Sequence, residues 1–435
     1  MTRGRLDEAV AAESGWMEDL LAELVGAPTV LGAEEPGQAV MARAFADCGL
    51  EPRDVWLDHD AIRADPCSSP FSWSVEGKRD VVARWAGTGG GRSLILNGHV
   101  DVVPPAARAL WTADPFTPRR DGDWLYGRGA GDMKAGLVAM TGAVRALRRA
   151  GIALRGDLEL QSVVEEECTG NGTLQCLLSG ARADACVITE PHPDHLTVAQ
   201  VGVLWFHVDV GGTPAHAARA ATLGHNAIDA AYTVLAELRA LERELNADPP
   251  APYDAFVHPI NLNPGVIAGG DWASTVAAEC TLSCRLATYP GEDPRALQER
   301  VEAAVARAAG RDAFLAASPP RVRYDGFVCE GSVVSADEPV VGVLSGAYAR
   351  VHGEPPALQA TTATTDARHF IRHGIPAVCF GPRAERIHGI DERVSLASMG
   401  ECARVLAHFV ADWCGEARNA GVRDPGGAGP GAARP

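Results

Sequence analysis

The chain contains 435 residues, more than one hydrophobic core usually serves, so we expect it to divide into two domains. Its hydrophobic content of 46% is typical of a folded protein. The formal net charge of -17 leaves no general basic surface for a phosphate backbone, which argues against nucleic acid as a partner.

The sequence contains no stretch of transmembrane length, and its charged first residues lack the apolar segment of a secretory signal. The eleven cysteines are an odd number without a CxxC pair, which argues against a disulfide framework. Cys280 and Cys284 lie in a strand-like run without further ligand residues at zinc-finger spacing, and we interpret them as packing residues. These features predict a cytoplasmic protein that does not bind membranes.

The first two hundred residues alternate between helical and strand patterns. Apolar residues recur at helical spacing over 16–25 and 136–149, and a strand is expected at 93–96. Four compact apolar runs end in polar residues, as buried parallel strands do: SLILNGHVDVV, DLELQSVVEEE, ACVITEP and, later in the chain, AVCFGP. This alternation predicts an α/β layer with a functional site at the carboxyl ends of its strands.

From residue 203 to 327 the pattern changes to strand, helix, two strands, helix and strand. Its helices are expected at 226–245 and 294–309. The order βαββαβ predicts a ferredoxin-like domain inserted into the α/β domain.

A histidine and an aspartate follow the first of the four apolar runs. In NGHVDVVP, His99 and Asp101 come after a strand that ends at Gly98, so both side chains are expected on the same side. His99 suits a metal ligand, and the Asp101 carboxylate would accept the proton on the imidazole nitrogen that does not bind metal. An exposed strand end is the alternative interpretation.

A glycine-rich turn before a predicted helix carries Asp132. In LYGRGAGDMKAG the glycines let the backbone approach a bound ion closely, and the carboxylate could bridge two metal ions. A phosphate-binding loop is the alternative, but the spacing GxxxxGK[ST] is absent. The turn therefore favours a metal site.

Three consecutive acidic residues, Glu165, Glu166 and Glu167, follow an apolar strand in SVVEEECTGNGT. Adjacent carboxylates repel one another unless a cation neutralises them. A solvated run of charges is the alternative, but the apolar strand before the triplet and the glycine-rich turn after it favour a buried position.

Glu190 in ACVITEPH and His388 in ERIHGIDERV also stand at the end of an apolar strand or in the loop behind one. Nitrogen and oxygen ligands of this kind suit two zinc ions that share one carboxylate. The candidate metal ligands are His99, Asp132, Glu167, Glu190 and His388.

Six motifs in this order resemble a known family, the metallopeptidases and deacylases that include acetylornithine deacetylase, succinyl-diaminopimelate desuccinylase, aminoacylase and carboxypeptidase G. The motifs are GHVDVVP, GRGAGDMKAG, the EEExxGxGT block, the EP dipeptide, GGTPAHAA followed by GHNAI, and HGIDERV. They span nearly the whole chain. The resemblance implies a zinc-peptidase-like α/β catalytic domain with an inserted ferredoxin-like domain that serves as lid and dimer surface.

The expected division of the chain follows from this resemblance and from the patterns above. Its parts are a catalytic domain in two segments, 1–202 and 328–420, a lid and dimerisation domain at 203–327, and a disordered tail at 421–435.

The resemblance also assigns the metal ligands. His99 and Glu190 would hold one ion, Glu167 and His388 the other, and Asp132 would bridge them.

The same resemblance implies three catalytic residues: Glu166 as general base, Asp101, and His216. Family members usually carry Asp-Glu-Glu at the acidic triplet, and alignment on the downstream glycines places Glu165 away from the ions. His216 in GGTPAHAA lies in a turn at the tip of the lid and would stabilise the oxyanion across the subunit boundary of a homodimer.

A substrate with a free carboxylate is implied as well. Arg368 in TTATTDARHF and Arg285 in TLSCRLATYPGE lie where the family binds this group, and a guanidinium offers it paired donors. Surface salt bridges are the alternative for both arginines. Many relatives have Asn-Val-x-Pro where this chain has Ser-Thr-Val-Ala-Ala, so Thr275 would replace an amide donor, and Asn263 is a further candidate.

Together these features predict a dinuclear metal-dependent amidohydrolase that deacylates an N-acyl amino acid, as acetylornithine deacetylase does. Its cofactors would be two divalent ions, zinc or else cobalt or manganese. The expected partners are a small N-acyl amino acid or dipeptide and a second copy of the chain. A dipeptidase or carboxypeptidase of the same family is the alternative, and a non-catalytic binding protein is disfavoured because all five ligands and Glu166 are present.

Overall fold

A mixed nine-stranded sheet forms the centre of the larger part of the molecule. The computed structural model describes residues 3–417, so the tail expected at 421–435 lies outside the described residues. The strands of this sheet are β1 (Pro52–Trp56), β2 (Arg79–Trp85), β3 (Leu94–His99), β6 (Leu158–Val163), β7 (Cys186–Ile188), β8 (His195–Gln200), β14 (Ser332–Val333), β15 (Ala357–Thr361) and β16 (Ala377–Cys379). They lie in the order β1-β2-β6-β3-β7-β16-β8-β14, with β15 paired to β8.

The central strands run parallel and position the candidate site. β3 pairs in parallel with β6 and with β7, and β7 pairs in parallel with β16. These four strands are the four apolar runs of the sequence, and every residue of β3 is buried, which confirms their prediction as buried strands. Because parallel strands end at the same edge, the residues that follow β3, β6 and β7 come close together.

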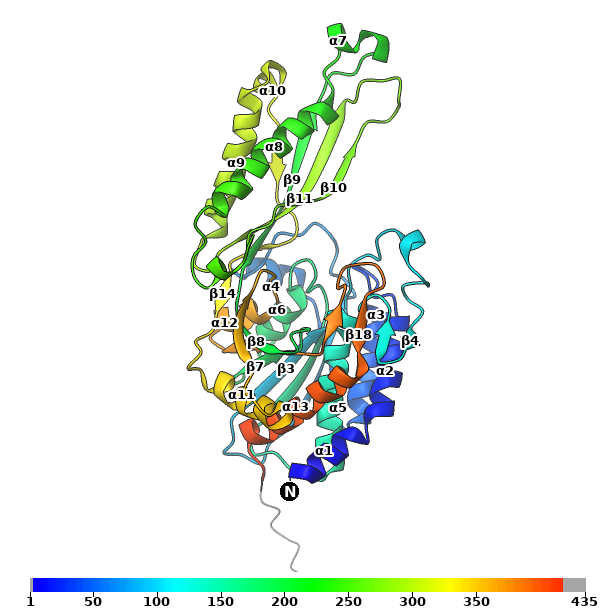
Figure 1. Cartoon of the computed structure of the whole chain (residues 1–435), viewed down its shortest axis with the longest axis vertical. Coiled ribbons are helices and arrows are strands. Elements are labelled where there is room, and N and C mark those ends of the chain that lie inside the picture. The colour runs from blue at the N-terminus through cyan, green and yellow to red at the C-terminus, as the bar shows by residue number, and fades with distance from the viewer. Residues whose placement is uncertain (1–2, 418–435) are drawn as a thin grey trace, which may run out of the picture.

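Helices cover both faces of this sheet (Figure 1). Leu94 and Leu96 of β3 belong to the core formed with helices α5 and α13, whereas Ile95 between them faces the core formed with α12. The helices are α1 (Arg3–Ala11), α2 (Ser14–Gly26), α3 (Glu35–Asp47), α4 (His59–Ala64), α5 (Ala135–Arg149), α6 (Asn171–Leu178), α11 (Pro339–His352), α12 (Ala367–Arg372) and α13 (Leu396–Cys414). α2 and α5 confirm the helices predicted from apolar spacing. No helix among residues 3–417 is long and apolar enough to cross a membrane.

The start of α5 packs very closely on the end of β7. A side chain at Gly136 would place its Cβ only 1.9 Å from the carbonyl oxygen of Thr189, so glycine is required there. The turn before α5, Ala130–Lys134, leaves helical backbone at Asp132 (φ -113°, ψ 98°) and Met133 (φ -126°, ψ 32°). Close packing therefore holds this turn, which carries Asp132, against the residues that follow β7.

A small four-stranded sheet lies beside the carboxyl edge of the large one. Its order is β17-β18-β5-β4. The strands are β4 (Arg119–Asp121), β5 (Trp124–Tyr126), β17 (Ala384–Glu385) and β18 (Arg393–Ser395). The loop between β17 and β18 contains His388.

The inserted domain, called the lid below, extends from the larger part as an elongated arm (Figure 1). Its main elements are β9 (Gly202–Gly211), α8 (Ala227–Leu245), β10 (Asn263–Gly269), β11 (Glu279–Thr288), α9 (Pro294–Gly310), β12 (Arg321–Arg323) and β13 (Val328–Cys329), with the short helices α7 (Ala220–Leu223) and α10 (Ala313–Ala317). The strands pair antiparallel in the order β10-β11-β9-β12, with β13 also on β9. This arrangement confirms the βαββαβ prediction.

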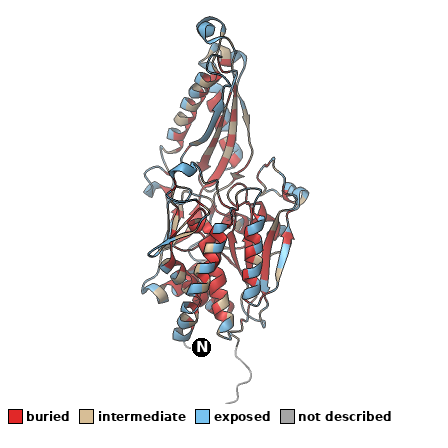
Figure 2. Cartoon of the chain, turned by 90° about the vertical axis from the view of Figure 1, so that its right-hand side faces the viewer, coloured by how far each residue is buried: buried red, intermediate tan, exposed pale blue. Residues whose placement is uncertain are grey.

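The lid has one covered and one open face. Residues of β9 such as Phe206 and Val208 are buried in a core with α8 and α9, and Cys280 and Cys284 of β11 belong to the same core. Both cysteines are free, which confirms them as packing residues. Arg285, on the opposite face of β11, is only partly buried. Figure 2 shows the far end of the lid largely exposed.

Candidate metal centre

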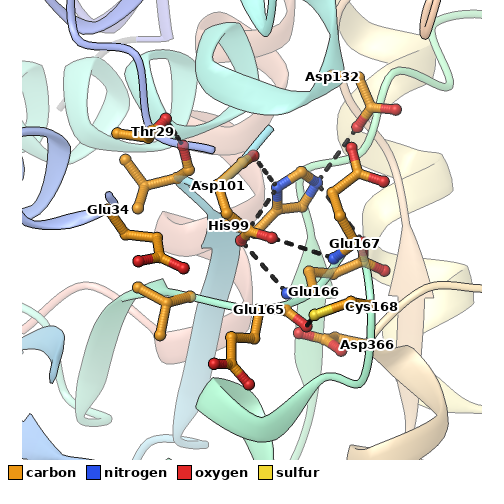
Figure 3. Close-up of polar contacts among 12 residues, drawn as sticks. Thr29, Glu34, His99, Asp101, Asp132, Glu165, Glu166, Glu167, Cys168 and Asp366 are labelled. Carbon is orange, nitrogen blue, oxygen red and sulfur yellow. Dashed lines mark hydrogen bonds and ion pairs between the residues drawn. The ribbon is translucent and has the colours of Figure 1, made fainter. Parts of the chain in front are cut away.

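His99 ends β3 and is 1% exposed. Its Nδ1 lies 2.9 Å from the main-chain carbonyl oxygen of Asp101, so Nδ1 donates and Nε2 is left to face the cluster. The Asp101 carboxylate lies 3.7 Å from Nδ1. It instead accepts the backbone N–H groups of Glu166 (3.2 Å) and Glu167 (3.1 Å), as Figure 3 shows. The structure therefore differs from the expected contact: the Asp101 carbonyl orients the imidazole, and its carboxylate anchors the acidic triplet.

Asp132 lies between the two candidate histidines. Its Oδ1 is 3.2 Å from Nε2 of His99, and its Oδ2 is 3.2 Å from Nε2 of His388. The turn before it needs glycine, because Gly129 has a φ of 79°. A carboxylate that directs one oxygen to each of two imidazoles has the geometry of a bridging ligand.

Glu165, the first residue of the acidic triplet, turns away from the histidines. Its backbone has a φ of 64°, and its carboxylate lies 2.5 Å from Nζ of Lys78. Trp73 Nε1 (3.0 Å) and Asn171 Nδ2 (2.7 Å) also donate to it. This carboxylate is fully occupied by protein donors, in keeping with the alignment that placed Glu165 away from the ions.

Glu166, Glu167 and Glu190 face the histidines. Glu167 Oε1 lies 3.0 Å from Nε2 of His388, while Glu190 Oε1 and Glu166 Oε2 lie 3.6 Å and 3.9 Å from Nε2 of His99. Glu166 Oε1 is buried and has no hydrogen-bond partner. Within residues 3–417, two groups have the spacing of a metal site: His99 with Asp132 and Glu167, and His99 with Glu166 and Glu190.

Burial and like charge shape the electrostatics of this cluster. Burial raises the pKa of Glu166 and of Glu190 well above the ordinary value. Burial acts on Asp132 as well, but its two hydrogen-bonded imidazoles hold its pKa below the usual range. Burial alone would lower the pKa of His388, yet the carboxylates of Glu167 and Asp132 raise it to about 11. The cluster thus contains more carboxylates than its imidazoles neutralise, which fits a site for divalent cations.

Glu392 and Arg128 support the cluster and were not identified from the sequence. Glu392 accepts two consecutive backbone N–H groups that end at Asp132 (2.9 and 3.0 Å), and it pairs with Arg128 at 2.5 Å. Arg128 also donates to the carbonyl oxygen of Gly389 at 3.2 Å. This buried pair ties the turn of Asp132 to the loop of His388. The sequence offered one signal for Glu392: it is an acidic residue four positions after His388, in the same short loop.

Two candidate substrate residues are cross-strand neighbours in the lid. Asn263 of β10 pairs in register with Arg285 of β11. Arg285 donates one hydrogen bond, from Nη2 to the carbonyl oxygen of Thr362 at 3.4 Å. Burial lowers the pKa of Arg285, and no carboxylate of the described chain lies within ion-pair distance of it. Its guanidinium is therefore available to an anion.

Arg368 is placed differently, in the interior beside the acidic triplet. It is 3% exposed, and it donates to the carbonyl oxygens of Thr365 and Thr169, both at 2.8 Å. Its Nε is buried without a hydrogen-bond partner. Arg368 thus uses two of its five N–H donors on the backbone, and its Nη2 also lies 3.6 Å from the Asp366 carboxylate.

His216 and Thr275 lie together at the far end of the lid. They form an isolated antiparallel bridge, and both are exposed. Helix α7, which begins four residues after His216, is at the end of the lid farthest from the large sheet (Figure 1). The structure therefore separates these two candidates from the metal cluster of the same chain.

Comparisons with known proteins find relatives in both sequence and structure. Residues 95–412 match the sequence profile of peptidase family M20/M25/M40. N-formyl-4-amino-5-aminomethyl-2-methylpyrimidine deformylase of Bacillus subtilis is 33% identical over 365 residues, which cover 79% of this chain and 85% of the deformylase. Succinyl-diaminopimelate desuccinylase of Dinoroseobacter shibae is 26% identical over 353 residues, covering 78% and 88%. The di-peptidase Dug1p of Saccharomyces cerevisiae has a similar structure, with a TM-score of 0.76 at 14% identity, covering 95% and 98%.

Proposed function

Because the chain belongs to peptidase family M20/M25/M40 and is a metal-dependent amidohydrolase, we propose that it removes the acyl group from an N-acyl amino acid. The position of Asp132 carries the proposal: each of its oxygens faces one histidine, next to the buried carboxylate of Glu166. Such an arrangement suits hydrolysis by water without a covalent enzyme intermediate.

We assign one ion to His99 and Glu190, the other to Glu167 and His388, and a shared position to Asp132. Imidazole nitrogens and carboxylate oxygens suit zinc, and they are compatible with cobalt or manganese. When bound, the ions would polarise the scissile carbonyl and favour ionisation of the attacking water.

Glu166 handles the proton in this proposal. Its Oε1 is buried and unpartnered, so it is free to take a proton from the attacking water and later to deliver it to the leaving nitrogen. Asp101 is a positioning residue, because its carboxylate fixes the backbone N–H of Glu166. His216 of a second copy supplies the donor to the oxyanion.

Metal content gives the first prediction. Purified protein is expected to hold two divalent ions per chain, because clustered carboxylates need cationic neutralisation. Elemental analysis on protein of known concentration measures this. Active protein with only trace metal would contradict the assignment.

A panel of amide substrates tests the reaction itself. N-acetyl and N-succinyl amino acids are expected to give a higher kcat/KM than dipeptides or carboxypeptidase substrates. N-formyl amines belong in the panel, since a 33% identical relative is a deformylase and a formyl preference would narrow the acyl group. A dominant rate on dipeptides would replace the deacylase proposal with the dipeptidase alternative.

Arg285 gives the second prediction. Arg285→Ala is expected to raise KM about 10- to 100-fold for substrates with a free carboxylate, because a hydrogen bond to a charged group contributes about 1.5–3 kcal/mol. Methyl esters of the same substrates should be nearly unaffected. Steady-state kinetics on acid and ester pairs measures the difference, and equal losses on both would contradict the role. Arg368→Ala is the comparison, and it should also lower the melting temperature because Arg368 binds two buried carbonyl oxygens.

A homodimer through the lid completes the proposal. β10 is an edge strand of the lid sheet, and it exposes Val266 (56%) and Ile267 (50%). Tyr232 of α8 and Trp272 are 60% and 71% exposed. An edge strand beside apolar side chains suits pairing with a second copy.

The free cysteines support a reducing compartment such as the cytoplasm.

A further inference from the structure

The two histidines of the metal cluster differ in how they are held. The side chain of His99 is 1% exposed, whereas that of His388 is 50% exposed. Five non-glycine residues in the described chain have positive φ, and three of them lie in the loop of His388: Arg386 (58°), His388 (60°) and Asp391 (54°). Such backbone persists only where surrounding contacts fix it.

One contact holds this loop to a segment that is far away in the sequence. The Asp391 carboxylate accepts two hydrogen bonds from Thr112, one from its backbone N–H (2.9 Å) and one from its hydroxyl (2.7 Å). We call this pair the clasp. Thr112 is itself anchored, because the indole of the preceding Trp111 donates to the carbonyl oxygen of Pro105 at 2.7 Å.

The clasp and the buried Arg128–Glu392 pair hold the loop at separate points. Trp111 packs on the Arg128 guanidinium, 5.3 Å from the ring centroid, and Arg128 donates to Gly389. The loop is thus held at Gly389, Asp391 and Glu392, all of which closely follow His388. No comparable outside support is needed at His99, which ends a fully buried strand.

We propose that Thr112 and Asp391 position His388 and thereby set the affinity of the cation site formed by His388 and Glu167. This inference rests on the dinuclear centre proposed above. Without the clasp, the loop loses the contact that holds Asp391 at positive φ. The imidazole of His388 then moves from its place beside Asp132 and Glu167. The site formed by His99 and Glu190 keeps its geometry, because its residues follow β3 and β7.

Metal titration of apo protein tests the clasp. Thr112→Val and Asp391→Ala should lower the affinity for one ion about 10- to 100-fold, the usual cost of losing a residue that orients a ligand, and leave the other unchanged. Asp391→Asn should restore most of the affinity, since its amide oxygen accepts the N–H and its amide group donates to the hydroxyl. Zinc titration against a competing chelator, with the bound ions counted per chain, measures both affinities.

Arg108→Gln is the matched control. It removes an exposed ion pair with Asp114 (3.0 Å) from the same segment as Thr112, and it should bind both ions as the unmodified protein does. Two ions bound with unchanged affinity in Thr112→Val and Asp391→Ala would overturn the clasp. Equal weakening of both ions, or a fall in melting temperature as large in Asp391→Asn as in Asp391→Ala, would do the same. An unmodified protein that binds fewer than two ions would instead refute the dinuclear centre, and the clasp with it.

Discussion

Glu166→Gln is expected to lower kcat by about 10²–10⁴-fold, the usual contribution of a positioned acid or base, while two ions stay bound. The amide keeps the size of the side chain but neither takes nor delivers the proton. Glu166 Oε2 lies 3.9 Å from His99 Nε2, whereas the nearest oxygens of Asp132 and Glu190 lie 3.2 and 3.6 Å from it. Steady-state kinetics combined with elemental analysis of the same preparation measures both effects.

Glu167→Ala is the matched comparison, because the neighbouring residue is assigned to an ion. Its Oε1 is 3.0 Å from His388 Nε2, so its loss should reduce the metal content by one ion per chain as well as the activity. The backbone N–H groups of both residues still reach Asp101 in either variant. If Glu166→Gln lost an ion and Glu167→Ala kept both, the alignment through the triplet would be wrong by one position.

The positions of His99, Glu166 and Glu190 could be predicted because each residue stands at or just after the end of a recognisable strand. β3, β6 and β7 are short apolar runs, and parallel strands in one sheet end at one edge, so His99, Glu166 and Glu190 had to meet. The lid was predictable for a related reason. Its long helices have apolar residues at helical spacing and its half-buried strands alternate, whereas the strands of the surrounding sheet are continuous apolar runs.

The supporting contacts could not be predicted, because they join residues far apart in the sequence. Glu392 and Arg128 are separated by 264 positions, and Asp391 and Thr112 by 279. The adjacent acidic residues Asp391 and Glu392 carry no local sign of which distant residues they contact. Asp101 shows the same limit within one motif. Its position beside His99 was correct, but the backbone N–H groups of the acidic triplet claim its carboxylate.

His216→Ala is expected to lower kcat by about 10²–10³-fold, the usual effect of removing one oxyanion donor. The expectation depends on a second copy of the chain. His216 lies in the exposed bridge with Thr275 at the far end of the lid, separated from the metal cluster of its own chain. In the homodimer that we propose, the partner's lid brings its His216 to this cluster. Oligomeric state by light scattering and kinetics of the single variant provide the first check.

Complementation between two inactive variants decides whether His216 acts across the subunit boundary. Co-expressed His216→Ala and Glu166→Gln chains form mixed dimers in which one site has an intact Glu166 and receives the partner's intact His216. The other site lacks both groups. Random pairing gives mixed dimers half of the time, so activity should return to about a quarter of the unmodified protein. Each variant alone, prepared in the same way, is the control. A donor acting within its own chain would leave every combination inactive, because neither chain then holds a complete site.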